Sequence, residues 1–456
     1  MKPSGLGWAG DIPSDWDVAK ICLVAKLESG HTPSRQHPEY WVPSECTIPW
    51  FSLADVWQLR EGTQDYLGET SECISPMGIA HSAARLLPAG TVALSRTASV
   101  GFAGIMPRPM ATTQDFANWV PGERVVSEYL LYALRAMRDE FSRVMTGSTH
   151  QTIYMPDIRR LAIPVPPRDE QTRIVAHLRA RLPKLDALIA KKEQVLALLA
   201  EKRQALITQA VTKGLGPNAP MKESGNEALP SIPRNWQIVP LRYLLSFGPR
   251  NGVSPPTAAG EGVLSFSISA VRDGKVTIEG NEKYVDFDRA SARAYWLARG
   301  DILLMRGNGS LSLVGTCGLV ETVPEECTYP DILMRMRAGR RLMPEFLVAA
   351  INSPYVRGQV ETLAKTSNGT FKISGEDVRT LQIAVPPIDE QRQIVTRMHV
   401  ELRRLDGVAV RVGDQLDRLR EYRQALITAA VTGKLDIASV ALTASVISHH
   451  AEAELA

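Results

Sequence analysis

Four short polar segments hold the side chains that are best suited to binding chemistry. Segments 96–101 and 306–310 follow runs of apolar residues, and segments 146–151 and 365–372 follow helical patterns. Arginine and asparagine can form paired hydrogen bonds with the edges of guanine and adenine, and small Gly, Ser and Thr residues let the backbone approach a phosphate. Structural turns and plain surface loops are the alternative interpretation. The candidate contact residues are Arg96, Thr97, Ser99, Ser148, His150, Gln151, Arg306, Asn308, Ser310, Asn368, Thr370 and Lys372.

The sequence contains none of the common catalytic motifs. It has no GxxxxGK[ST] phosphate loop, its eight histidines form no HExxH motif or spaced Cys/His cluster, and Ser95 and Ser99 lack a GxSxG turn. Segment 254–257 (SPPT) superficially resembles the loop with which amino-methyltransferases stack a flipped base, but Thr257 replaces the stacking ring, and a proline-rich loop is the alternative. We therefore expect no catalytic residue, metal or cofactor in this chain.

The composition is that of an ordinary globular protein with more than one core. Of 456 residues, 44% are hydrophobic and 22% are charged, which is too long for one small domain and too apolar for a disordered chain. No apolar run reaches the roughly 18 to 20 residues that span a bilayer, and the N-terminal residues lack a signal-peptide core. The five cysteines form no CxxC pair, as expected in a reducing compartment. We expect a soluble, cytoplasmic protein. Its net charge of +3 does not by itself indicate nucleic-acid binding.

The chain consists of two copies of one unit. The sequence LAIPVPPRDEQTRIV at 161–175 returns as LQIAVPPIDEQRQIV at 381–395, and KRQALIT at 202–208 returns as YRQALIT at 422–428. IPSDW ending at Trp16 likewise returns as IPRNW ending at Trp236, and all three pairs share an offset of 220 residues. The two copies diverge up to about Leu161 and Leu381 and match closely over the following fifty residues. Each copy therefore has a divergent part followed by a shared part.

The shared part is predicted to be a long helix with a coiled-coil seam. Alternating steps of three and four residues from Val175 and from Val395 meet mainly apolar residues, in the same register in both copies. The leucines of the two seams are Leu178, Leu182, Leu185, Leu196, Leu199, Leu206, Leu402, Leu405, Leu416, Leu419 and Leu426.

The helix ends carry their own signals. Each helix is expected to begin after a Pro-Pro pair, with Asp169 or Asp389 capping the first turn, and to end near Gly214 or Gly433. Helix breakers inside the predicted helices are expected to kink or loosen them, and these are Pro183, Gly407 and Gly413.

The two seams are predicted to pair with each other in an antiparallel coiled coil. A parallel pair would force the chain to span the second globular region and still bring both helix starts together. An antiparallel pair, related by a pseudo-twofold axis, places one globular region at each end. The alternative is that both are core helices of two adjacent domains.

The divergent parts are predicted to be mixed α/β (α+β) domains. Apolar runs at 91–96, 301–306 and 275–280 indicate strands, runs at 128–137 and 344–352 indicate helices, and polar loops are expected at 146–158 and 365–378. The predicted boundaries are 1–166 for the first domain, 167–213 for the first helix, 214–228 for a linker, 229–386 for the second domain, 387–434 for the second helix and 435–456 for a flexible tail.

The two-copy plan, the VPPxDEQ entry to each helix and the KRQALIT and YRQALIT exits followed by AVT closely resemble the specificity subunits of type I restriction-modification enzymes, over nearly the whole chain. The resemblance implies that each divergent region is a target recognition domain that reads half of a bipartite sequence in double-stranded DNA. It also places a DNA-facing loop at 96–101 and 306–310, and implies that the shared helices dock modification subunits. Those partners would use S-adenosylmethionine to methylate adenine, and restriction (motor-nuclease) subunits would use ATP and Mg²⁺. The chain itself would be non-catalytic.

Charge and divergence set two further expectations. Residues 1–166 carry a net charge of −3, residues 225–386 carry +2, and the first helix carries +5; the helix is expected to neutralise phosphates, or else is simply solvated. Because the two domains differ, we expect an asymmetric target, with an unread gap of about 5 to 8 base pairs set by a rod of roughly 60 Å. The alternative function, from another class, is a scaffold whose coiled coil spaces two domains that bind sugars or peptides.

Overall fold

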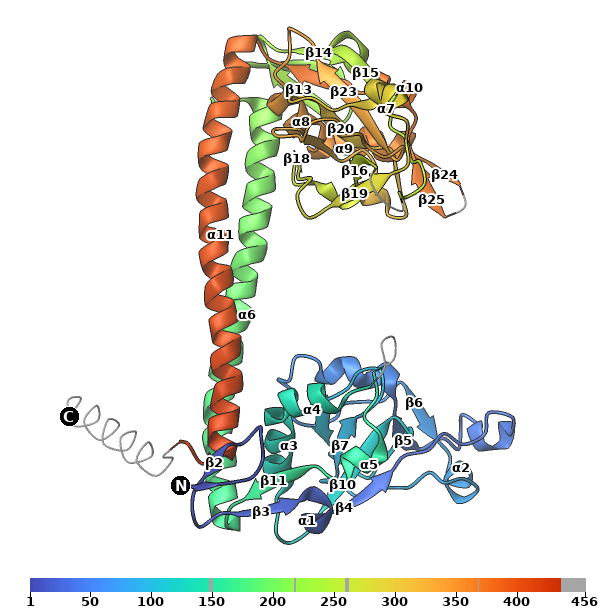
Figure 1. Ribbon diagram of the computed structural model, residues 1–456, viewed down its shortest axis with the longest axis vertical. Coiled ribbons are helices and arrows are strands. Elements are labelled where there is room, and N and C mark those ends of the chain that lie inside the picture. The colour runs from blue at the N-terminus through green and yellow to red at the C-terminus, as the bar shows by residue number, and fades with distance from the viewer. Residues whose placement is uncertain (147–150, 217–218, 259–261, 368, 436–456) are drawn as a thin grey trace, which may run out of the picture. The chain divides into compact units, whose positions relative to one another are not determined.

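The computed structural model describes residues 1–146, 151–216, 219–258, 262–367 and 369–435 (Figure 1). The chain divides into two units, Met1–Gln194 with Gly413–Ala456, and Val195–Val412. Each unit contains a mixed domain of strands and short helices together with a segment of each of two long helices. The predicted fold class is confirmed. Most of the predicted tail, residues 436–456, lies outside the described residues.

The domain of the first unit is built on an antiparallel sheet of order β4-β10-β7-β8. A smaller sheet of order β6-β5-β9 and the pairs β1-β2 and β11-β3 complete its strands. These strands are β1 (Lys2–Pro3), β2 (Asp11–Ile12), β3 (Asp17–Lys20), β4 (Ala25–Ser29), β5 (Ile48–Phe51), β6 (Glu72–Ile74), β7 (Val92–Ser95), β8 (Ala103–Ile105), β9 (Ala111–Thr112), β10 (Phe116–Pro121) and β11 (Ala162–Val165). The helices are α1 (Ile21–Val24), α2 (Pro76–Ala80), α3 (Ser127–Ala136), α4 (Arg138–Val144) and α5 (Met155–Ile158), with 3₁₀ turns η1 (Pro38–Trp41) and η2 (Leu53–Leu59).

The domain of the second unit has a larger sheet of order β15-β23-β20-β22-β18-β17. A sheet of order β21-β25-β24 and the pairs β12-β13, β14-β26 and β16-β19 accompany it. The strands are β12 (Met221–Asn226), β13 (Leu229–Pro233), β14 (Gln237–Pro240), β15 (Leu245–Asn251), β16 (Val263–Phe266), β17 (Val271–Arg272), β18 (Lys275–Val276), β19 (Glu282–Val285), β20 (Ile302–Met305), β21 (Gly307–Asn308), β22 (Cys317–Leu319), β23 (Leu333–Ala338), β24 (Lys365–Ser367), β25 (Thr370–Lys372) and β26 (Gln382–Val385). The helices are α7 (Arg289–Ala292), α8 (Pro344–Ile351), α9 (Pro354–Leu363) and α10 (Gly375–Thr380), with 3₁₀ turns η3 (Leu241–Tyr243), η4 (Ile268–Ala270), η5 (Arg293–Tyr295) and η6 (Leu311–Leu313).

A continuous apolar core joins each domain to the long helices. In the first unit, the buried strand β7 and the apolar face of α3 share a core cluster with Val175, Leu178 and Ala430 of the long helices. In the second unit, β20 and α8 share a cluster with Ala210 and Val395. Burial on this scale stabilises each domain on its helix segments, at about 25 cal/mol per Å² of apolar surface removed from water.

The long helices are α6 (Arg168–Lys213) and α11 (Ile388–Val431). Both are continuous helices, and Pro183, Gly407 and Gly413 lie inside them. Asp169 lies inside the first turn of α6 and therefore interacts with the helix dipole, but it is not the capping residue that we expected. Gly214 and Gly433 adopt the left-handed conformation, with φ of +71° and +67°, which confirms them as helix stops.

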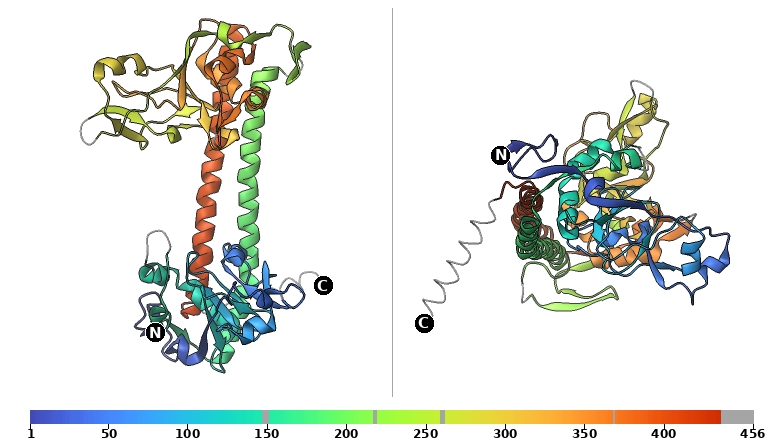
Figure 2. Two further views of the ribbon diagram at one scale, coloured as in Figure 1. Left: turned by 90° about the vertical axis from the view of Figure 1, so that its right-hand side faces the viewer. Right: turned by 90° about the horizontal axis from the view of Figure 1, so that it is seen from below.

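Within each unit the two helices run antiparallel (Figures 1 and 2). In the first unit Asp186 pairs with Arg423 at 2.6 Å and Glu193 pairs with Arg420 at 2.7 Å. Residue numbers therefore rise along α6 where they fall along α11. In the second unit Arg203 pairs with Asp406 at 3.4 Å. The predicted seam leucines are buried or half-buried, while most of the residues between them are exposed.

Two segments that we expected to be irregular contain strands. The expected loop 365–378 contains β24, β25 and the start of α10; β25 pairs with β21 on one side and with β24 on the other. The predicted linker 214–228 contains β12, which pairs with β13. In contrast, only the first two residues of the predicted strand 275–280 form one, β18. β12 pairs with the next strand along the chain and β24 pairs with the next strand β25, whereas β25 also pairs with the distant strand β21. The polar composition of both segments led us to expect loops, although strand pairing depends on context as well as on composition.

Candidate nucleic-acid interface

The first unit brings its two polar segments together beside β7. Thr97 forms a bridge with Thr152, the amide of Ala98 donates to the carbonyl of Gln151 at 2.9 Å, and the amide of Ile153 donates to the carbonyl of Arg96 at 2.8 Å. Gln151 is therefore a neighbour of Arg96 and Thr97 in space, although more than fifty residues separate it from them in the sequence.

The second unit repeats this arrangement beside β20. The amide of Ile373 donates to the carbonyl of Arg306 at 2.9 Å, and β21 pairs with β25 so that Asn308 lies opposite Phe371. The candidates Arg306, Asn308, Thr370 and Lys372 are thereby gathered at one place. In both units the first polar segment follows a buried strand, β7 or β20. The chain at the second polar segment then pairs with the first segment.

In the first unit the side chain of Arg96 holds the loop together. The guanidinium of Arg96 donates from Nε to the carbonyl of Gln114 at 3.1 Å and from Nη1 to the carbonyl of Ile153 at 3.5 Å. Ala98 has a φ of +59°, so the chain turns sharply between Thr97 and Ser99. Thr97 and Ser99 are half-buried, and Gln151 is exposed.

In the second unit the cationic side chains of Arg306 and Lys372 are more available for contact with a ligand than Arg96 is in the first. Within the described part of the chain, the half-buried guanidinium of Arg306 makes no side-chain hydrogen bond or ion pair, and Lys372 is exposed. Asn308 accepts from the amide of Ser310 at 2.9 Å through Oδ1 and approaches Met305 Sδ at 3.4 Å through Nδ2. Asn308 therefore shapes the turn with one end of its amide. Ser310 is exposed and Thr370 is half-buried.

Three predicted contact residues have no structural description. Ser148, His150 and Asn368 lie outside the described residues.

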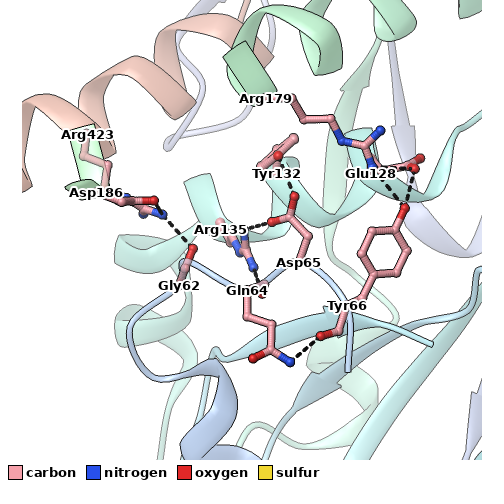
Figure 3. Close-up of polar contacts among 10 residues, drawn as sticks. All are labelled: Gly62, Gln64, Asp65, Tyr66, Glu128, Tyr132, Arg135, Arg179, Asp186 and Arg423. Atoms are coloured by element: carbon pink, nitrogen blue, oxygen red, sulfur yellow. Dashed lines mark hydrogen bonds and ion pairs between the residues drawn. The ribbon is translucent and has the colours of Figure 1, made fainter. Parts of the chain in front are cut away.

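A polar network joins the first domain to the long helices (Figure 3). Arg423 of α11 donates to Asp186 of α6 at 2.6 Å and to the carbonyl of Gly62 at 2.6 Å. Arg179 of α6 donates to the hydroxyl of Tyr66 and to Glu128 of α3, both at 3.0 Å. A loop of the domain, residues 62–66, is thus bonded to both helices.

Largely buried groups form the centre of this network. Asp65 accepts from Arg135 at 2.5 Å and from the hydroxyl of Tyr132 at 2.8 Å. Burial, together with the charge of Asp65, raises the pKa of Tyr132, and burial lowers the pKa of Arg135 against the opposing effect of Asp65. Burial and the bond to Glu128 raise the pKa of Tyr66. The raised pKa values keep the hydroxyls of Tyr66 and Tyr132 protonated near pH 7, so both can donate to their carboxylate partners.

Sequence reasoning missed this network. The partners come from four separate segments, so no local motif reveals them. One signal was available, since Asp186 and Arg423 return at the repeat offset as Asp406 and Arg203, which also form an ion pair.

The junction between domain and helix is the same in both units. Trp16 Nε1 donates to Glu170 at 3.0 Å and Trp236 Nε1 donates to Glu390 at 3.0 Å. Beside them, β3 pairs with β11 and β14 pairs with β26 in registers that correspond residue by residue at the 220 offset. Gln171 accepts from the amide of Val126 at 3.0 Å, and Gln391 accepts from the amide of Met343 at 2.8 Å. Two different domains are therefore mounted on their helices in one way.

Two chemical features are missing from the part of the chain that the structure describes. No three His, Cys, Asp or Glu side chains there are grouped so that they could hold a metal ion. None of its helices is both long and apolar enough to cross a membrane.

Comparisons with known proteins agree on one family. A family model described as the type I restriction modification DNA specificity domain matches residues 13–198. The chain is 25% identical over 435 residues to the EcoKI specificity subunit of Escherichia coli, which covers 94% of this chain and 90% of that protein. It is 29% identical over 247 residues to the MjaIX specificity subunit of Methanocaldococcus jannaschii, covering 52% and 53%.

A solved structure has the same fold. It comes from work on complex assembly and conformational transition of the type I R-M system, and it superimposes with a TM-score of 0.69 at 16% sequence identity. The match covers 93% of this chain and 100% of that chain.

Proposed function

The chain belongs to the specificity subunits of type I restriction-modification enzymes, and we propose that it reads an asymmetric, two-part target in double-stranded DNA. Specificity subunits are non-catalytic components of a larger complex. The observation that carries the proposal is that matching helix junctions present two domains whose paired polar segments differ in sequence. The comparisons do not support the alternative of a scaffold for sugars or peptides.

The paired polar segments are the proposed contact surfaces. In the second domain, Arg306 and Asn308 read base edges, while Ser310, Thr370 and Lys372 contact phosphates or bases. In the first domain, Thr97, Ser99 and Gln151 make the contacts, and Arg96 positions the loop through its bonds to backbone carbonyls. Ser148, His150 and Asn368 belong to the same segments of sequence and complete the proposed set.

The partners supply the chemistry. Modification subunits dock on the long helices, bind S-adenosylmethionine and methylate adenine, and restriction subunits use ATP and Mg²⁺. The first helix contributes its net charge of +5 to the attraction of DNA. The complex acts in the cytoplasm.

A long-read map of methylated adenines tests the proposal. Cells that carry this chain with its modification partner should show one asymmetric motif in two parts, separated by an unread gap of about 5 to 8 base pairs. Cells with the partner alone should lack that motif. A continuous or palindromic motif would contradict the proposed reading.

Salt dependence provides a test in solution. A complex that contacts several phosphates should lose affinity for its target steeply with salt, by about 10³-fold or more between 50 and 200 mM for six or more contacts. A target with one half-site scrambled is the matched control, because it retains the phosphates and loses only sequence contacts. Affinity that is independent of salt would exclude phosphate contacts as its source.

A further inference from the structure

The long helices present corresponding surfaces in the two units. At the 220-residue offset, Arg203 corresponds to Arg423 and Gln204 corresponds to Gln424. In the first unit this surface is covered. Arg423 donates to the carbonyl of Gly62 at 2.6 Å, and the hydroxyl of Tyr66 at the end of the loop donates to Glu128 at 2.8 Å (Figure 3). Gln424 donates to the carbonyl of Arg135 at 3.0 Å.

In the second unit the corresponding surface lines a cavity of about 670 Å³. Its helix side consists of Arg203, Gln204, Ile207, Met398, His399 and Leu402, and its domain side includes Gly274, Glu345, Val348 and Asn352. The burial of one pair of apolar side chains also shows that the helix surface is covered in the first unit and open in the second. Ile427 is fully buried in the first unit, whereas its counterpart Ile207 is only partly buried. The cavity is therefore the space that the first unit fills with its own loop.

One residue that lines the cavity, Glu345, has a carboxylate oxygen without a partner in the part of the chain that the structure describes. Gln171 and Gln391 bind the amides of Val126 and Met343, which aligns α3 with α8 and makes Glu345 the counterpart of Glu128. Glu128 accepts from Tyr66 and from Arg179. Glu345 Oε2 is buried without a hydrogen-bond partner among the described residues. A histidine, His399, occupies the position that corresponds to Arg179 and also lines the cavity.

We propose that this cavity is a docking site for a turn of a partner polypeptide. The turn offers a backbone carbonyl to Arg203, as Gly62 does to Arg423, and a tyrosine hydroxyl or a cationic side chain to Glu345, as Tyr66 does to Glu128. Nucleic acid is not the proposed occupant, because the lining mixes charges and is not a basic patch. Its cations are Arg203, Arg272, Lys275 and Arg357, and its carboxylates are Asp273, Glu321 and Glu345. The site lies apart from the chemistry of DNA reading, and the inference does not rest on the proposed function.

The chain itself provides the probe. A synthetic peptide with the sequence of residues 59–68, LREGTQDYLG, should bind the full-length chain saturably in a calorimetric or NMR titration. Glu345→Gln should weaken binding about tenfold, because a hydrogen bond to a charged acceptor is lost at a buried position. Glu376→Gln is the matched control: Glu376 lies in the same domain, is exposed and does not line the cavity, so its variant should bind as the unmodified chain does. A peptide with phenylalanine in place of its tyrosine should bind the unmodified chain as weakly as the original peptide binds Glu345→Gln.

Thermal unfolding separates loss of binding from loss of folding, since the midpoint temperature of Glu345→Gln should equal that of the control Glu376→Gln. Three results would overturn the proposal: no saturable binding of the peptide at millimolar concentration, equal affinity of Glu345→Gln and Glu376→Gln, or equal affinity of the tyrosine and phenylalanine peptides. Displacement of the peptide by duplex DNA from the unmodified chain would assign the cavity to nucleic acid and would also overturn it.

Discussion

Arg96 and Arg306 occupy corresponding backbone positions, yet their side chains differ in their hydrogen bonding. Each carbonyl accepts from an isoleucine amide just after the second polar segment, that of Ile153 or Ile373. The guanidinium of Arg96 is engaged by the carbonyls of Gln114 and Ile153. The sequence predicted the segments, because a polar run after a buried strand is a local signal. It could not predict the two roles, because the partners of Arg96 come from distant parts of the chain.

Arg306→Ala should weaken discrimination in one half-site by about 1 to 3 kcal/mol, the cost of a lost paired contact with a base, and leave the other half-site unaffected. Asn308→Ala should have the same specificity effect, with an added effect on the turn because Oδ1 accepts from Ser310. Methylation rates on substrates mutated in each half-site separately provide the measurement. Arg289→Ala, at an exposed position of the same domain, is the control. If Arg306→Ala and Asn308→Ala both keep the original specificity profile, the reading loop lies elsewhere.

The cysteines should differ widely in reactivity. Cys22 is exposed, whereas burial raises the pKa of Cys327 to about 12 and also raises the pKa of Cys317. A raised thiol pKa lowers the fraction of reactive thiolate at pH 8, and burial blocks the reagent as well. Iodoacetamide labelling followed by mass spectrometry should modify Cys22 first and should reach Cys317 and Cys327 only in denaturant. Equal labelling rates in the native protein would contradict the described burial.

At the scale of elements, the period of the apolar residues made α6 and α11 predictable. Seam positions such as Leu182 and Leu416 are buried, and the pairing within each unit is antiparallel as predicted. Prediction failed where long-range pairing decides the structure. The strands β24 and β25 lie in a polar segment that we expected to be a loop; they pair with each other, and β25 also pairs with the distant strand β21.

The loop of residues 62–66 should be a major source of stability in the first unit. Asp65→Ala removes the acceptor of Arg135, whose side chain is only 10% exposed, and leaves a buried cation without its partner. We expect a loss of about 3 kcal/mol in the free energy of unfolding. Glu61→Ala, at a neighbouring exposed position, should change it by less than about 0.5 kcal/mol. Urea denaturation of both variants decides this, and equal midpoints would show that the network contributes little.

The seam should control the activity of the whole assembly. Replacing Leu196 and Leu199 with Asp places two charges on half-buried positions between the helices. Methylation should fall at all target sites together, and the ratio between half-site mutants should not change. Leu198→Asp is the matched control, because Leu198 is 55% exposed and lies on the outer face. A changed half-site preference in the double variant would contradict the division between reading domains and spacing helices.

At the scale of the whole molecule, the repeat was visible in the sequence and the identical junctions were not. The repeat of Trp16 as Trp236 is visible in the sequence, but the bonds of these residues to Glu170 and Glu390 form only when the chain is folded. The junctions explain why the helices match while the domains diverge: the mounting is fixed, and the reading surface is free to vary. Divergence leaves the target of each domain undetermined by sequence, because that depends on side chains placed by unrelated loops.

The identical junctions make the asymmetry of the target testable by exchange of domains. Replacing residues 17–160 with residues 237–380 leaves Trp16, β11 and the start of α6 in place, and the incoming β14 can pair with β11 in the register that it has with β26. Such a chain carries the second domain twice. Two identical readers related by a pseudo-twofold axis select a palindrome, so the methylation map should change from an asymmetric motif to an inverted repeat of the half-site that Arg306→Ala alters. The reciprocal exchange, with residues 17–160 in both places, should give a different palindrome built from the other half-site. Should either chain fold, bind its modification partner and still methylate the original asymmetric motif, the two domains would not be the readers of separate half-sites.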